Sequence, residues 1–113
     1  MTNSSALDRG EWAARLDEVT KQHAGQAITI EVLDPTYGDN SEVERLPFNY
    51  ANYDHKDDVV TIGVGGNSIR YPVVLRHLIV HPTEIDVAEQ AMRVVDPDGT
   101  TTLVSFFSAD APS

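Results

Sequence analysis

The sequence predicts an α+β protein in which one N-terminal helix packs on a strongly twisted antiparallel sheet of five or six strands, a sheet that would curl into a small open barrel. Two observations carry this prediction. Residues 7–25 have a helical repeat of apolar side chains, and the rest of the chain has short alternating segments separated by turn formers. A length of 113 residues suits one modest core. We therefore expect residues 1–113 to be a single domain, ordered over about 7–108 with frayed ends.

The helix is expected between Leu7 and Gly25. Asp8 and Glu11 have the spacing of a capping box, and Leu7 and Trp12 have the spacing of a hydrophobic staple. Gly25 should end the helix in a left-handed conformation. The face turned toward the sheet should carry the residues at i, i+4, i+7 and i+11, which are Trp12, Leu16, Val19 and His23.

Strands are expected where β-branched residues alternate with polar ones. The first three segments are joined by short turns, so they should form an antiparallel meander. Pro47 cannot donate to a ladder and therefore places its strand at a sheet edge or marks a bulge. Asp96-Pro97-Asp98-Gly99 predicts the turn of a closing hairpin. The expected strands are 26–33, 41–53, 59–64, 75–80, 91–95 and 100–107, with a brief extended piece at 84–87.

Composition excludes several classes of function. The chain has no cysteine, so disulfides, thiolate metal sites and a cysteine nucleophile are ruled out. Eighteen acidic and eight basic residues give a net charge of −10, which argues against nucleic acid or an anionic membrane as the main partner. No apolar run approaches the length of a membrane span, and Met1–Asn3 does not open a signal peptide. We expect a cytoplasmic protein.

The residue types that bind metals and phosphates do not occur here in the required patterns. His77 and His81 would lie about 13 Å apart on a strand, too far for one ion. Asp54, Asp57 and Asp58 lack the alternation and the glycine of a calcium loop. The cluster of glycines at 63–66 cannot feed a helix, because Pro72 follows closely, and a tight turn explains it. We expect no metal and no cofactor.

One stretch differs in charge from the rest of the chain. No acidic residue occurs between Asp58 and Glu84, and the basic and imidazole residues of this stretch are candidates for binding an anionic group, on a small ligand or on a second copy. The alternative is that Arg76 pairs with Glu84 or Asp86. The candidate binding residues are Arg70, Arg76, His77 and His81.

The order of these features resembles a small bacterial family classed only as a domain of unknown function. The likeness spans almost the whole chain, and it implies a shared fold without supplying any catalytic residue. The residues that carry it are Trp12 and Gly25, the strand Ile28–Leu33, Leu46-Pro47, Asp57-Asp58 with Ile62, Leu78-Ile79 with Pro82, Asp98-Gly99, Leu103 and Phe106.

The predicted function is a small non-enzymatic module that binds a partner protein, a second copy or a modest ligand. This prediction rests on the lack of a convergent catalytic set and on the edge strands of the expected sheet. One alternative is a small enzyme that pairs a histidine, His55 or His81, with a carboxylate. A further alternative is an acidic inhibitor that mimics nucleic acid.

Overall fold

The computed structural model describes residues 7–36, 38–66 and 74–107, with residues 38–45 as backbone only. The frayed ends expected at 1–6 and 109–113 lie outside the described residues. One helix, α1 (Trp12–His23), follows a single 3₁₀ turn, η1 (Arg9–Glu11). The strands are β1 (Ala27–Asp34), β2 (Gly38–Asp54), β3 (Val59–Gly65), β4 (Val74–Val80), β5 (Glu84–Val87), β6 (Ala91–Val95) and β7 (Thr101–Phe107).

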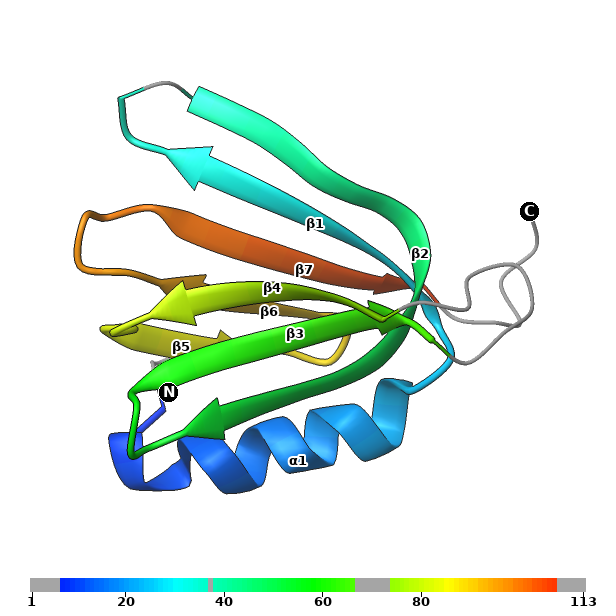
Figure 1. Cartoon of the computed structure of the whole chain (residues 1–113), viewed down its shortest axis with the longest axis horizontal. Coiled ribbons are helices and arrows are strands. Elements are labelled where there is room, and N and C mark those ends of the chain that lie inside the picture. Colours follow the sequence, from blue (N-terminus) through cyan, green and yellow to red (C-terminus); the bar gives the residue numbers. More distant parts are fainter. Residues whose placement is uncertain (1–6, 37, 67–73, 108–113) are drawn as a thin grey trace.

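All seven strands belong to one antiparallel sheet, in the order β4-β3-β2-β1-β7-β6-β5. The class of fold is confirmed, but the predicted count of five or six strands is wrong. The segment expected to be a brief extended piece is β5, which pairs with β6 over all four of its residues. The edge strands β4 and β5 do not pair with each other, so the curled sheet is not closed (Figure 1).

Strand β2 produces the curl because it changes partner half-way along its length. Its residues up to Pro47 pair with β1, and its residues from Phe48 onward pair with β3. Register shifts interrupt both ladders, two opposite β1 and one between Phe48 and Tyr50, and such bulges bend a strand. The expectation of a bulge near Pro47 is thus confirmed, whereas an edge position is wrong, since β2 lies between β1 and β3.

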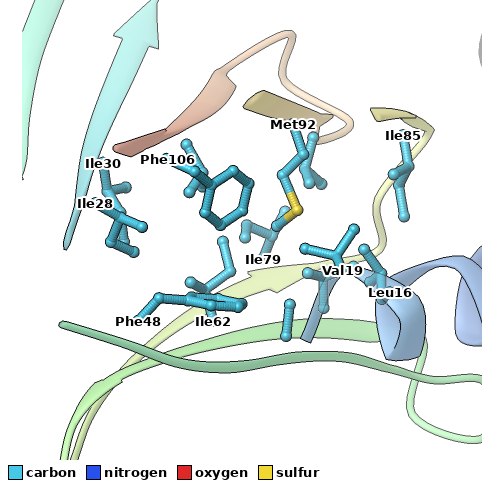
Figure 2. Close-up of a cluster of buried hydrophobic side chains, with 14 of the residues drawn as sticks. Leu16, Val19, Ile28, Ile30, Phe48, Ile62, Ile79, Ile85, Met92 and Phe106 are labelled. Carbon is cyan, nitrogen blue, oxygen red and sulfur yellow. The ribbon is translucent and has the colours of Figure 1, made fainter. Parts of the chain in front are cut away.

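The bend creates two layers that enclose the core. In Figure 1 the layer of β3 and β4 lies in front of β5 and β6. Figure 2 shows Phe48 of β2 and Ile62 of β3 facing Phe106 of β7 and Met92 of β6, with Leu16 of α1 beside the same cluster. Phe106 meets Phe48 edge to face at 5.1 Å.

The predicted helix stripe is confirmed, because all four of its residues are buried: Trp12, Leu16, Val19 and His23. The predicted capping box is wrong. Asp8 makes no side-chain cap, and the chain enters through η1. Two backbone contacts set this entry instead: Leu7 N–H donates to the Ile85 carbonyl at 2.9 Å, and the Trp12 indole donates to the Leu7 carbonyl at 3.2 Å. Gly25 has a φ of 88°, as expected for its position after the helix.

Helix α1 also takes the place of a neighbouring strand along the second half of β2, where β1 no longer pairs. The Thr20 hydroxyl accepts from the Ala51 N–H at 2.9 Å and lies 2.9 Å from the Ala51 carbonyl. Gly25 N–H donates to the Phe48 carbonyl at 2.8 Å, and Phe48 N–H donates to the Gln26 carbonyl at 2.8 Å. The bend would leave backbone N–H and C=O groups along the second half of β2 without a neighbouring strand. The helix and the turn after it therefore supply hydrogen-bond partners for these groups.

Candidate functional site

The outer surface of strands β2, β3 and β4 is the candidate site, and we call it the outward face. Register places its nine residues in three rows, because the alternate residues of these strands point into the core. The rows are Tyr50–Gly63–Arg76, Asn52–Thr61–Leu78 and Asp54–Val59–Val80.

Apolar side chains are exposed on this face. Leu78 is 57% exposed and Val80 is 50% exposed, and both point outward from edge strand β4. Leu75, on the opposite face of the same strand, is 54% exposed. Within residues 7–36, 46–66 and 74–107, every large hydrophobic side chain that is exposed belongs to β4. Apolar side chains gathered on one edge strand mark a surface that another chain can cover.

One end of the outward face is built around Gly63. A Cβ added to this residue would lie 2.3 Å from Cε1 of Tyr50, so the tyrosine ring lies over the glycine. The Tyr50 hydroxyl accepts a hydrogen bond from Arg76 Nε at 3.1 Å. Gly63 lies inside β3, as the expected strand 59–64 has it, and a tight turn does not account for this member of the glycine cluster, which gives room to a cross-strand aromatic ring.

Of the four predicted binding residues, the three that the structure describes do not form one cluster. Arg70 lies outside the described residues, while Arg76 lies on the outward face. The alternative pairing of Arg76 with Glu84 or Asp86 is wrong, since both carboxylates pair with Arg93.

His77 and His81 line a groove of about 480 Å³ between β4 and the β6–β7 turn. Val32 of β1 and Thr102 of β7 also line it, and the turn contributes Asp96 and Asp98. The Asp96 carboxylate is held by the turn itself, because Oδ1 accepts from the N–H groups of Asp98 and Thr100 at 2.9 and 3.1 Å. The predicted Pro-Asp-Gly turn is confirmed, and this groove follows from the β2 bend that brings β4 near β1 and β7.

Asp58 is the centre of a polar cluster that the sequence did not predict. Its Oδ1 accepts from the Tyr53 hydroxyl at 2.6 Å and from Arg9 at 3.3 Å, and its Oδ2 lies 3.1 Å from His81 Nδ1. The His81 N–H also donates to the Asp58 carbonyl at 2.7 Å. Arg9 donates to the Pro82 carbonyl at 3.0 Å. Asp58 and His81 both have left-handed backbones, with φ of 56° and 57°.

The model of a family of unknown function, DUF5335, matches residues 3–111. The chain belongs to this family. The resemblance to a domain of unknown function is thereby confirmed. An uncharacterised protein of Aquifex aeolicus (strain VF5) is 33% identical over 102 residues, which cover 86% of each chain. No solved structure matches the chain.

Hydrogen bonding fixes the charges of the cluster in this DUF5335 protein. The Tyr53 hydroxyl, followed by His81 and then Arg9, holds the pKa of Asp58 below its ordinary value of 3.8. The hydrogen bond to Asp58 raises the pKa of Tyr53 above its ordinary value of 10.0. Asp58 is therefore held ionised as an acceptor, and Tyr53 is held neutral as a donor.

Substituting Asp58→Asn should lower the stability at neutral pH, and the difference from the wild type should shrink below about pH 4. A carboxyl group whose pKa falls on folding contributes stability above its unfolded pKa and loses it as the pH falls through its folded pKa. Urea midpoints measured at about pH 7 and about pH 3 check this. Asp57→Asn, in the same turn, is the control. Equal differences at both pH values would contradict the expectation.

The contacts of this cluster favour a structural role over catalysis. A histidine at hydrogen-bond distance from a carboxylate is what the alternative enzyme would need, and His81 and Asp58 meet that condition. However, both oxygens of Asp58 are engaged, and Tyr53, which donates to it, is less readily ionised. The cluster joins η1, β2 and the end of β4. His55, the other candidate, lies exposed in the β2–β3 turn.

The described part of this DUF5335 protein contains neither a metal-binding cluster nor a membrane-spanning helix. Among the described residues, no three histidine, aspartate or glutamate side chains come close enough to hold a metal ion. His23 is buried against Phe106, with ring centroids 4.0 Å apart, and its Nδ1 lies 2.8 Å from Gln26 Oε1. No helix in the described part of the chain has the length and apolar character needed to cross a membrane.

Proposed function

We propose that this protein is a protein-interaction module that uses the outward face and the edge strand β4 as its contact surface. The observation that carries the proposal is that Leu75, Leu78 and Val80 are each at least half exposed on one edge strand. Monomeric proteins generally shield such strands, because an edge with apolar side chains pairs readily with other chains.

The charge around this surface favours a protein partner. The sequence from Val59 to Thr83 contains no acidic residue, although the whole chain has eighteen. An acidic inhibitor that mimics nucleic acid would present rows of carboxylates, whereas this face presents leucine, valine and Arg76. These features support the interaction module over the acidic inhibitor.

Site-specific photo-crosslinking tests the proposal. A photoreactive amino acid placed at Leu78 in cells of the native host should give a discrete protein adduct. The same amino acid at Lys21, which is exposed on α1, should give none. The mass of the adduct distinguishes a second copy of the chain from another protein. Equal and diffuse labelling at both positions, or no adduct at Leu78, would refute the proposal.

A further inference from the structure

The arrangement of charges on the outward face indicates what covers it. Arg76 occupies one corner of the three rows, and Asp54 occupies the corner diagonally opposite. Arg76 uses Nε on the Tyr50 hydroxyl, and its two terminal nitrogens make no hydrogen bond to the described residues. Asp54 uses Oδ1 to accept from the N–H groups of Lys56 and Asp57 at 2.9 and 3.4 Å. Within residues 7–36, 46–66 and 74–107, no group donates to its other oxygen, which is the oxygen we assign to a cation.

We propose that the outward face is the interface of a face-to-face dimer of two copies of this chain, in which Arg76 of each copy pairs with Asp54 of the other. This inference rests on the proposed function and names the partner. The copies would be related by a two-fold axis that lies in the interface, passes through the central Thr61 and bisects the line from Arg76 to Asp54, close to the diagonal from Tyr50 to Val80.

Such an axis makes the face complementary to itself. It exchanges the two remaining corners, so that each arginine meets an aspartate. It also places Leu78 of one copy against Val59 of the other, both of which are apolar. Thr61 lies on the axis, and Tyr50 and Val80 lie near it, so each of these residues faces its own counterpart. Because the axis is diagonal to the strands, the strands of the two copies cross steeply, which is a known class of sheet packing.

The net charge explains why two acidic chains would meet here. With a charge of −10 each, two copies repel one another over most of their surfaces. Strands β3 and β4 have no carboxylate, and Asp54 on β2 is the acidic residue of the nine. Apolar contact can therefore form on the outward face with little charge repulsion. The one carboxylate of this face, that of Asp54, would pair with Arg76 of the other copy.

The size of the face indicates a weak dimer. Strands about 4.8 Å apart and rows about 7 Å apart place the nine residues within about 10 by 14 Å, so the face is well below the area of about 800 Å² per partner that a standard interface buries, and it belongs with weak, transient contacts. We expect a reversible equilibrium with a dissociation constant on the order of 10–100 μM.

Sedimentation equilibrium from about 5 to about 500 μM tests the dimer directly. The wild type should shift from monomer to dimer over this range, and Leu78→Lys should remain monomeric. Arg76→Asp and Asp54→Arg should each weaken association at least about tenfold, because each places like charges together. The double variant, with the charges exchanged, should return to within about threefold of the wild type.

Controls with the same charge changes separate the specific pair from net charge. Lys21→Asp and Asp17→Arg alter an exposed pair on α1 and should leave the dimer unchanged. Circular dichroism of each variant shows whether it is folded, and Arg76→Asp remains a test if Asp54→Arg disturbs its turn. A wild type that stays monomeric throughout, or a double variant as weak as the single variants, would overturn the dimer. If the wild type is monomeric while Leu78 crosslinks to another protein, the proposed function stands and the second copy is excluded.

Discussion

Replacing Trp12 by alanine is expected to destabilise the protein by about 3–5 kcal/mol, the range for removing a large buried aromatic side chain. Trp12 is 1% exposed and meets the Tyr53 ring edge to face at 5.0 Å. Its indole N–H donates to the Leu7 carbonyl, and the Arg9 guanidinium lies 4.5 Å from the centre of its ring. The substitution therefore removes core packing and also releases the segment that leads into α1.

Urea unfolding followed by circular dichroism measures this effect, since the variant lacks the single tryptophan needed for fluorescence. Trp12→Phe is the matched control, because it keeps an aromatic ring in the core and loses the indole N–H. We expect it to retain more than half of the stability that the alanine variant loses. A loss below about 1 kcal/mol for Trp12→Ala would show that α1 does not depend on this residue.

Local patterns in the sequence predicted the elements of the fold well. The helical repeat identified the buried face of α1, since a residue every third or fourth position is enough to define it. Alternation, β-branched residues and flanking turn formers placed the strands of the described residues to within a few positions, and the Asp96–Gly99 turn was predicted from residues that favour it. These features depend on neighbours in the chain, so one sequence contains the information.

The features that were missed depend on residues far apart in the chain. Asp58 looked like part of a solvated turn, yet it contacts Arg9 and His81, which lie 49 and 23 positions away. The close approach of the Tyr50 ring to Gly63 was missed because that ring comes from another strand. Asp8 has the sequence of a helix cap, but the pairing of Leu7 with Ile85 fixes the entry to the helix differently. A pattern of neighbouring residues in the sequence does not reveal contacts between residues that are far apart in the chain.

The candidate site was predicted only in part for the same reason. The absence of acidic residues between Asp58 and Glu84 indicated the segment that contains β4, and Arg76 of that segment does lie on the outward face. Leu78 and Val80 were read only as strand residues, because exposure at an edge follows from the order of strands in the sheet. Asp54 joins Arg76 on one surface only through the β2–β3–β4 register.

Replacing Thr20 by valine should destabilise the protein by about 1–3 kcal/mol, although the two side chains have nearly the same shape. The Thr20 hydroxyl lies within hydrogen-bond distance of the Leu16 carbonyl and of both backbone groups of Ala51. Valine would leave the Ala51 N–H and C=O without a partner at the point where β2 has lost β1 as a neighbour. An unsatisfied backbone group costs more than the net gain of a typical hydrogen bond.

Thr20→Ser keeps the hydroxyl and loses a methyl group, so it should lie within about 1 kcal/mol of the wild type. Hydrogen exchange at the Ala51 amide gives a local measure, and exchange should be faster in Thr20→Val than in Thr20→Ser. If the valine variant is as stable as the serine variant and its Ala51 amide is equally protected, then α1 packs against the edge of β2 without taking the place of a strand. The outward face is built on β2 as well as on β3 and β4, so a less ordered β2 at Ala51 should also disturb that face. We therefore expect Thr20→Val to dimerise more weakly than the wild type as well as to be less stable.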